Sequence, residues 1–206
     1  MIGIVDYGVG NLFSLRSSLA MIGADAVVSS DAAVLRRADR LILPGVGAFG
    51  DAAAKLRASG LDRVVTAQAQ AGTPVMGICL GMQLLFDRGL EFGTHAGLGL
   101  LPGTVAPLAG RIPASLRIPH IGWNGLRIVR PHPLLRYVQP GDCVYFVHSY
   151  AATDCADSVI ATAEYGIDVP AAVARGSIMG CQFHPEKSGE VGLRILRAFC
   201  ETEDWT

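Results

Sequence analysis

A cysteine framed by glycines stands at the end of a short apolar segment. The segment Gly77-Ile78-Cys79-Leu80-Gly81 follows Val75 and Met76, and an amphipathic run comes after it. A nucleophile mounted on a sharp strand-to-helix turn needs small residues on both sides, because the backbone is crowded there. A thiol at the N-terminus of the following helix also lies where partial positive charge favours the thiolate. The segment therefore predicts a nucleophilic Cys79.

A histidine and a glutamate late in the chain supply the partners that such a thiol needs. Met179-Gly180-Cys181-Gln182-Phe183 is typical of a strand and leads into His184-Pro185-Glu186-Lys187. Residues two apart in an extended segment point the same way, so we expect Glu186 to lie beside His184 and orient its ring. His184 then takes the proton of Cys79. Without this pairing, Cys79 fits a buried apolar residue equally well, since free cysteines are among the most buried residue types.

A zinc site is the other common use of His-x-Glu with cysteines. In nucleobase deaminases that signature continues to Pro-Cys-x-x-Cys. The five cysteines of this chain, at positions 79, 143, 155, 181 and 200, contain no Cys-x-x-Cys pair and lack the density of a secreted disulfide framework. We therefore expect no metal, no cofactor and a reducing cytoplasm as the setting.

The composition argues against several classes of protein. A net charge of -1 gives no electrostatic basis for binding nucleic acid or an anionic membrane. Hydrophobic residues make up 50% of the chain, but no uninterrupted apolar run is long enough to span a bilayer. The first residues, Met1-Ile2-Gly3-Ile4-Val5-Asp6, are typical of a strand and not of a signal peptide. We expect one soluble domain over residues 1–206.

Alternating strands and helices must position these side chains. Between the apolar strands of the first half lie helical stretches such as 12–22, which ends at Gly23. Fully apolar strands that alternate with helices indicate an α/β fold with a parallel sheet covered on both faces. The strands are predicted at 2–5, 26–28, 41–43 and 75–78.

The second half has a different pattern. Strands punctuated by proline and glycine predict an antiparallel or mixed element, and a last helix over about 189–200 packs back on the sheet. Ligands of open α/β sheets bind at the carboxyl ends of the strands, where both Cys79 and His184 fall. The predicted strands of this half are 104–108, 126–129, 144–147, 159–163 and 171–174.

A second glycine cluster, Pro44-Gly45-Val46-Gly47-Ala48-Phe49-Gly50, follows the strand at 41–43. Its glycines match Gly-x-Gly-x-x-Gly, so a dinucleotide-binding module that uses Gly45 to Gly50 and has no catalytic activity is one possible interpretation. The acidic residue expected about twenty positions on, however, is missing. An oxyanion hole fits better, in which the amides of Val46 or Gly47 and of Leu80 hold the negative oxygen of a tetrahedral intermediate.

Together these motifs resemble a known family. The segments Gly77-Ile78-Cys79-Leu80-Gly81-Met82-Gln83 and Gln182-Phe183-His184-Pro185-Glu186-Lys187-Ser188 are similar to class I (triad) glutamine amidotransferases. The resemblance covers essentially the whole chain and implies a flavodoxin-like fold with a parallel-to-mixed central sheet flanked by helices. Four further segments are similar to the glutaminase subunits of imidazole glycerol phosphate synthase: 6–12, 44–49, 119–124 and 146–150.

The resemblance implies an activity in histidine biosynthesis. Cys79 would attack the side-chain amide of L-glutamine, with His184 as base and then acid and Glu186 as its orienter. Ammonia leaves, and water hydrolyses the glutamyl thioester to glutamate. The partner would be a (β/α)8-barrel cyclase that receives the ammonia through a channel and forms imidazole glycerol phosphate and an aminoimidazole carboxamide ribotide.

Further site residues are implied by position in the family. Gln83 and Glu91 match residues that hold glutamine, with Ser149 and Tyr150 near its carboxylate. The loop Asp87-Arg88-Gly89-Leu90-Glu91 departs from the more acidic loop usual there. The residues that match positions at or near the partner interface are Asn11, Trp123, Tyr145 and Lys187.

Three other interpretations fit the residues. The chain fits a glutaminase subunit that serves pyridoxal phosphate, purine or anthranilate synthesis. It also fits a cysteine protein on a similar scaffold, such as a stress-response hydrolase or glyoxalase, although His184 following a strand so late in the chain disfavours that class. The third is the dinucleotide-binding module. Trp123, between Gly122 and Asn124, is expected in a turn-like segment, which would expose a large aromatic side chain. Trp123 and Tyr145 also fit aromatic residues of the core or its rim.

Overall fold

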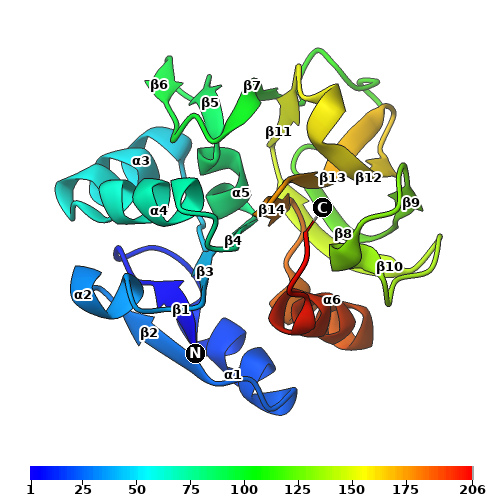
Figure 1. Ribbon diagram of the computed structural model, residues 1–206. Helices are drawn as coiled ribbons and strands as arrows, with labels where there is room; N and C mark the ends of the chain where they lie inside the picture. The colour runs from blue at the N-terminus through cyan, green and yellow to red at the C-terminus, as the bar shows by residue number, and fades with distance from the viewer. Residues whose placement is uncertain (206) are drawn as a thin grey trace.

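The computed structural model describes residues 1–205 and is built around an eight-stranded sheet (Figure 1). Its strands follow in the order β2 (Ala26–Ser29), β1 (Ile2–Val5), β3 (Arg40–Leu43), β4 (Val75–Ile78), β14 (Ile178–Cys181), β13 (Asp168–Arg175), β12 (Val159–Glu164) and β9 (Arg127–Ile128). Pairing is parallel from β2 to β14 and antiparallel from β14 to β9. The prediction of a parallel sheet with an antiparallel second half is confirmed.

Helices cover both faces of this sheet (Figure 1). Successive side chains of a strand point to opposite faces, so Ile4 packs in one core cluster with α1 and α6, and Val5 in another with α2, α3 and α4. The apolar character of the strands follows from this double burial. The helices are α1 (Leu12–Met21), α2 (Ala32–Leu35), α3 (Phe49–Ala58), α4 (Leu61–Gln70), α5 (Leu80–Leu84) and α6 (Gly189–Glu201), with 3-10 turns η1 (Pro133–Leu135), η2 (Ala156–Ser158) and η3 (Pro185–Lys187).

Two small sheets lie beside the carboxyl ends of the central strands. One contains β11 (Tyr150–Thr153), β7 (Leu101–Pro107), β5 (Phe86–Gly89) and β6 (His95–Ala96). The other pairs β10 (Cys143–His148) with β8 (His120–Gly125) in antiparallel register. None of the helices in residues 1–205 is long and apolar enough to cross a membrane.

The structure corrects three local predictions. The segment that contains Asp87 is not a loop: residues 86–89 form β5, which pairs with β7. Trp123 lies in β8 and not in a turn, because Asn124 and its neighbours pair regularly with β10. The run after Cys79 is not amphipathic, since all five residues of α5 are buried. The strands β5 and β8 were not predicted because they are short and contain polar residues, which obscure the alternation typical of a strand. The helix α5 has no polar face because the sheet and α3 enclose it.

The glycines around Cys79 permit close contact between backbones. A Cβ at Gly81 would overlap the carbonyl oxygen of Leu43 in β3, and one at Gly77 would lie 2.6 Å from the backbone nitrogen of Met82. A Cβ at Gly45 would lie 2.7 Å from the nitrogen of Gly81, so the turn after β3 packs directly on the start of α5. These three glycines are therefore required by packing.

We expect Gly81→Ala to destabilise the protein by about 3 kcal/mol or more, because overpacking against backbone forces the strand and helix apart. The gain of about 1 kcal/mol from alanine in a helix is smaller. Denaturant unfolding measures the difference. Gly125→Ala is the control, since its Cβ would meet nothing closer than 3.4 Å; equal unfolding midpoints for the two variants would contradict the packing argument.

Candidate active site

Cys79 lies at the turn between β4 and α5, in a backbone conformation that side chains rarely adopt. Its φ is 54° and its ψ is -111°, and a strained conformation of this kind costs about 1–3 kcal/mol. The parallel register of β4 and β14 pairs Ile78 with Cys181, and the N–H of Cys79 donates to the carbonyl of Cys181 at 2.7 Å. The chain after β14 therefore emerges beside the sulfur.

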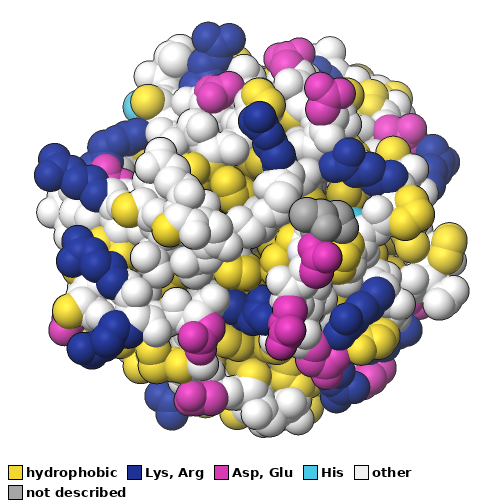
Figure 2. All heavy atoms as spheres, viewed as in Figure 1, with side chains coloured by type: hydrophobic (Ala, Val, Ile, Leu, Met, Phe, Trp, Pro, Cys, Tyr) yellow, Lys and Arg dark blue, Asp and Glu magenta, His cyan; other side chains and the backbone are white. Residues whose placement is uncertain are grey.

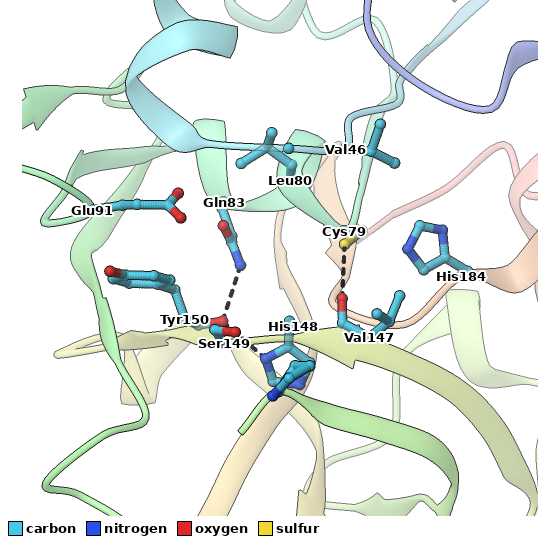
Figure 3. A pocket seen from close by; sticks show the side chains of 12 residues that line it. Val46, Cys79, Leu80, Gln83, Glu91, Val147, His148, Ser149, Tyr150 and His184 are labelled. Carbon is cyan, nitrogen blue, oxygen red and sulfur yellow. Dashed lines mark hydrogen bonds between the residues drawn. The ribbon is translucent and has the colours of Figure 1, made fainter. Parts of the chain in front are cut away.

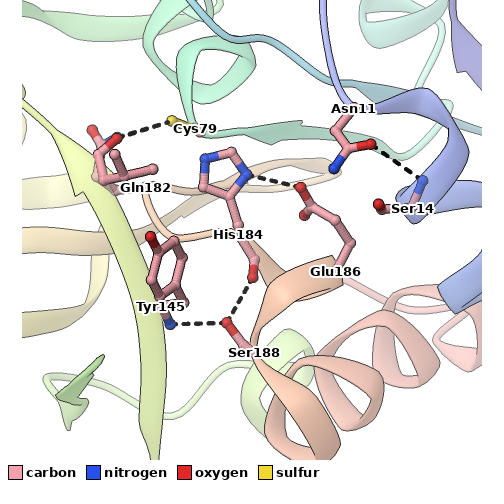
Figure 4. A network of polar contacts seen from close by, with 9 residues as sticks. Asn11, Ser14, Cys79, Tyr145, Gln182, His184, Glu186 and Ser188 are labelled. Atoms are coloured by element: carbon pink, nitrogen blue, oxygen red, sulfur yellow. Dashed lines mark hydrogen bonds and ion pairs between the residues drawn. The ribbon is translucent and has the colours of Figure 1, made fainter. Parts of the chain in front are cut away.

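His184 and Glu186 follow this strand and form a buried pair. The His184 Nδ1 atom is 2.8 Å from Oε1 of Glu186, and the two side chains are 3% and 4% exposed. Glu186 lies beside His184 as predicted, but the predicted reason, an extended segment with both side chains on one side, was wrong. Glu186 lies in the turn η3, so the chain folds back by a helical turn after His184 instead of running extended. The opposite edge of the ring faces Cys79 (Figure 4).

The surroundings of His184 favour its protonated form. Burial by itself lowers the pKa of His184, but hydrogen bonds with Cys79 and Glu186 and the charges of both groups outweigh it and raise the pKa to about 9. Ser188 braces the same turn, because its hydroxyl donates to the His184 carbonyl at 2.6 Å and accepts from the N–H of Tyr145 at 3.0 Å. The contacts of His184 with Cys79 and Glu186 therefore favour the imidazolium that forms when the ring takes the proton of Cys79.

A cavity of about 310 Å³ opens at Cys79, within the range of small-ligand sites. Figure 3 shows that residues from the turn after β3, from α5, from the loop after β5 and from the β10–β11 junction meet there. All predicted oxyanion and glutamine-holding residues line it. The lining comprises Val46, Gly47, Cys79, Leu80, Gln83, Glu91, Pro119, Val147, His148, Ser149, Tyr150 and His184.

Two of the predicted glutamine-holding residues also have internal partners. The Nε2 atom of Gln83 donates at 3.0 Å to the carbonyl of Tyr150 and at 3.0 Å to Oε1 of Gln182. The Glu91 carboxylate accepts from the N–H of Phe49 at 2.7 Å, which places a negative charge at the start of α3, where it is favourable. Both contacts use Nε2 of Gln83, and its side chain also lines the cavity.

Gln182 and Val147 contact the sulfur itself, and pattern reasoning assigned no role to either. The Cys79 Sγ atom lies 3.8 Å from Nε2 of Gln182 and 4.0 Å from the carbonyl oxygen of Val147. Gln182 is completely buried. A polar residue at the end of an otherwise apolar strand was the available signal, because buried amides need partners.

Three of the predicted interface residues form one surface cluster. The rings of Trp123 and Tyr145 are 6.2 Å apart, and Nζ of Lys187 lies 5.9 Å from the Tyr145 ring. Trp123 is 58% exposed, so its predicted exposure is confirmed. Asn11 has a different position: its Oδ1 accepts from the N–H of Ser14 and caps α1, and its side chain lies beside Glu186 (Figure 4).

The glycines 45–50 have packing roles that differ from a phosphate loop. Gly45 contacts the start of α5, and Gly50 lies inside α3, where a Cβ would meet the ring of His95 at 2.7 Å. In residues 1–205 no group of three or more His, Cys, Asp or Glu side chains is arranged to hold a metal ion.

Comparison with known proteins agrees with this geometry. The family described as "Glutamine amidotransferase class-I" matches residues 4–202. The chain belongs to this family. It is 50% identical over 202 residues to imidazole glycerol phosphate synthase subunit HisH of Geobacillus kaustophilus, covering 97% of this chain and 95% of that one. The HisH subunit of Lactococcus lactis is 47% identical over 199 residues, with 96% of each chain covered.

Solved structures show the same fold. A crystal structure of a glutamine amidotransferase has a TM-score of 0.75 at 21% identity and covers 97% of both chains. PurLQS from Thermotoga maritima has a TM-score of 0.73 at 22% identity and covers 96% of both chains. The predicted class I amidotransferase fold is therefore confirmed. The family match and the identity with HisH subunits show that this chain is a glutamine amidotransferase of the HisH family.

Proposed function

We propose that this glutamine amidotransferase is the glutaminase subunit of an imidazole glycerol phosphate synthase and acts in histidine biosynthesis. One observation carries the proposal: the thiol of Cys79, the His184–Glu186 pair and the predicted glutamine-holding residues meet at one cavity. The full-length similarity to HisH subunits supports the choice of pathway over pyridoxal phosphate, purine or anthranilate synthesis. The chain acts as one amidotransferase domain, residues 1–206, in the cytoplasm and without a cofactor.

The reaction proceeds by covalent catalysis. The proton of Cys79 passes to His184, and the sulfur attacks the side-chain amide carbon of glutamine. His184 then returns the proton to the leaving nitrogen, which departs as ammonia and leaves a glutamyl thioester on Cys79. Water, deprotonated by His184, attacks the thioester carbon, the C–S bond breaks, and glutamate is released. The Cys79 sulfur leaves as a thiolate and can take the proton back from His184. Glu186 holds the ring of His184 and stabilises its charge throughout.

The oxyanion hole belongs to the two turns that pack together above the sulfur. Leu80 is the first residue of α5, and the first N–H groups of a helix have no partner within it. Val46 and Gly47 line the same cavity from the turn after β3, where Gly47 has a φ of 93°. Amides aimed at the developing negative oxygen stabilise the tetrahedral intermediate.

Glutamine binds with its side chain toward Cys79 and its backbone groups toward the far end of the cavity. Glu91 attracts the α-ammonium group, and Ser149 and Tyr150 lie where they contact the α-carboxylate. Gln83 contacts the bound substrate from α5. These contacts hold both α-groups at the far end of the cavity and leave the side-chain amide directed at Cys79.

The partner is a (β/α)8-barrel cyclase subunit that receives the ammonia. It binds at Asn11 and at the surface cluster of Trp123, Tyr145 and Lys187. Exposed aromatic side chains are enriched where proteins bind one another.

Glutamate release from L-glutamine tests the proposal, with the chain alone and mixed with a cyclase subunit that carries its ribonucleotide ligand. Because free ammonia is wasted, we expect little release by the chain alone and stimulation in the complex of about 5–150-fold, the usual range of coupling between sites. Cys79→Ala provides the blank. Absence of release in both mixtures would exclude this pathway, and stimulation by a different synthase would select one of the other pathways.

A further inference from the structure

We propose that Gln182 is a positioning residue for the reaction: its side-chain amide donates a hydrogen bond to the Cys79 sulfur, and a buried polar network that reaches β8 holds it there. The inference rests on the proposed function, in which Cys79 is the nucleophile. Gln182 directly follows β14, and its backbone N–H pairs with the carbonyl of Ala171 at 2.9 Å.

The burial of Gln182 is costly and needs a reason. Its side chain is completely buried between Cys79 and Gln83, at a position that follows an apolar strand. An apolar side chain of the same size would avoid the cost of desolvating an amide. Hydrogen bonds at both ends of the amide, to Cys79 and to Gln83, offset this desolvation cost.

The direction of this amide is fixed by its neighbours. The carbonyl of Tyr150 can only accept, so Gln83 must present Nε2 to it, and the second N–H of that group then points to Gln182. Gln182 must therefore present Oε1 to Gln83. Its Nε2 group is left facing the sulfur at 3.8 Å.

This arrangement distinguishes the two protonation states of the sulfur. The Val147 carbonyl, 4.0 Å from Sγ, accepts from a thiol but repels a thiolate, whereas an N–H donor stabilises the thiolate. A hydrogen bond to an ionised acceptor is about twice as strong as one to a neutral acceptor. Gln182 therefore favours the transfer of the proton from Cys79 to His184.

The network continues away from the sulfur through two buried histidines. The Tyr150 carbonyl also accepts from Nδ1 of His148 at 2.9 Å, and Nε2 of that ring lies 3.0 Å from Nδ1 of His120. Nε2 of His120 accepts from Asn124 at 3.2 Å, and Asn124 also donates to the carbonyl of Glu164 at 2.8 Å. With carbonyl oxygens at both ends, only one set of proton positions satisfies every member.

Both histidines are held neutral, which this network requires. Burial lowers the pKa of each, to about 4 for His120 and about 4 for His148. Asn124 adjoins the exposed Trp123 in β8. The sulfur is thus joined by hydrogen bonds to the strand that carries the proposed partner surface.

Two substitutions separate the hydrogen bond from packing. Gln182→Met removes both polar ends, while Gln182→Glu keeps an oxygen for Gln83 and loses the donor to the sulfur. Gln70→Met, at the exposed last residue of α4, is the control. The titratable groups that act on Cys79 electrostatically, His184 and Tyr7, are retained. All variants carry Cys143→Ala, because Cys143 is exposed and would also be alkylated.

The readouts are the pH dependence of Cys79 alkylation by iodoacetamide, the thiolate absorbance at 240 nm, and kcat and KM for glutamine with the partner present. In both variants we expect the pH midpoint of alkylation to rise by about one unit or more, more in Gln182→Glu because a buried carboxylate also repels the thiolate. We expect kcat to fall about 10–100-fold, the effect of losing one hydrogen bond to a charged group, while KM changes less than about threefold.

An unchanged alkylation midpoint in Gln182→Met, which has no donor for the sulfur, would overturn the proposal, as would a loss of activity that appears only in KM. Alkylation and absorbance need neither glutamine nor a partner. If glutaminase activity is absent from the unsubstituted protein, the proposed function fails, and the midpoints still decide whether Gln182 positions the thiolate.

Discussion

Replacing Cys79 with alanine will lower glutamine hydrolysis by on the order of 10⁶-fold, to the background of the assay, because losing the nucleophile of a covalent mechanism removes the entire chemical step. Cys79→Ala keeps the backbone strain at this position, since alanine is also disfavoured at a φ of 54°. The variant is therefore expected to fold and to bind glutamine while it forms no thioester.

Cys79→Gly provides the matched variant. Glycine adopts this backbone conformation without strain, a relief of about 1–3 kcal/mol. Its greater freedom in the unfolded chain costs about 0.4–1 kcal/mol. The relief is larger, so we expect the glycine variant to be more stable than the alanine variant and equally inactive.

Glutamate release and denaturant unfolding measure these two effects, and mass spectrometry of the protein mixed with glutamine detects the thioester in the unsubstituted protein. Glutaminase activity that survives in Cys79→Ala would exclude Cys79 as the nucleophile. An alanine variant as stable as the glycine variant would show that the turn carries no strain. The conformation of the turn between β4 and α5 would then follow from packing alone and not from the need to hold a reactive side chain.

Sequence patterns predicted the local geometry around Cys79 where chemistry restricts the residue type. Gly77 and Gly81 were recognised because a crowded turn excludes larger residues, and the structure places backbone atoms where their Cβ atoms would be. Three strands of the first half, β1, β3 and β4, were recognisable because burial on both faces leaves few residue types. The edge strand β2 is only partly buried. Proximity of Cys79 and His184 follows from the pairing of β4 with β14, which extends the parallel sheet.

Sequence patterns did not predict the buried polar residues that bind one another across distant segments of the chain. His120, His148 and Gln182 lie in segments that carried the family resemblance, yet their mutual contacts span distant parts of the chain. Hydrophobic periodicity does not reveal such contacts, because in the sequence each of these polar residues looks like a solvent-exposed one. The strand β8 was missed for the same reason, since Asn124 and His120 interrupt its apolar pattern.

Glu186→Gln is expected to lower glutaminase activity by about 10²–10⁴-fold, because a neutral partner neither stabilises the imidazolium nor fixes its proton position. The pKa of His184, raised to about 9 by Cys79 and Glu186 against the effect of burial, should fall toward about 6.5, the ordinary value of histidine. His184 must be protonated to release ammonia. Activity of the unsubstituted protein should therefore persist up to about pH 9 and decline above it, while that of Glu186→Gln should decline at lower pH.

The raised pKa of His184 also makes the stability of the fold depend on pH. Because the pKa of folded His184 lies above its unfolded value, the bound proton stabilises the fold fully below about pH 6.5, and this stabilisation is lost as the pH rises through about 9. The melting temperature of the unsubstituted protein should approach that of Glu186→Gln between pH 7 and pH 10. Glu190→Gln, at an exposed glutamate in the first turn of α6, is the control. Parallel melting curves across this range would mean that Glu186 orients the ring without setting its proton affinity.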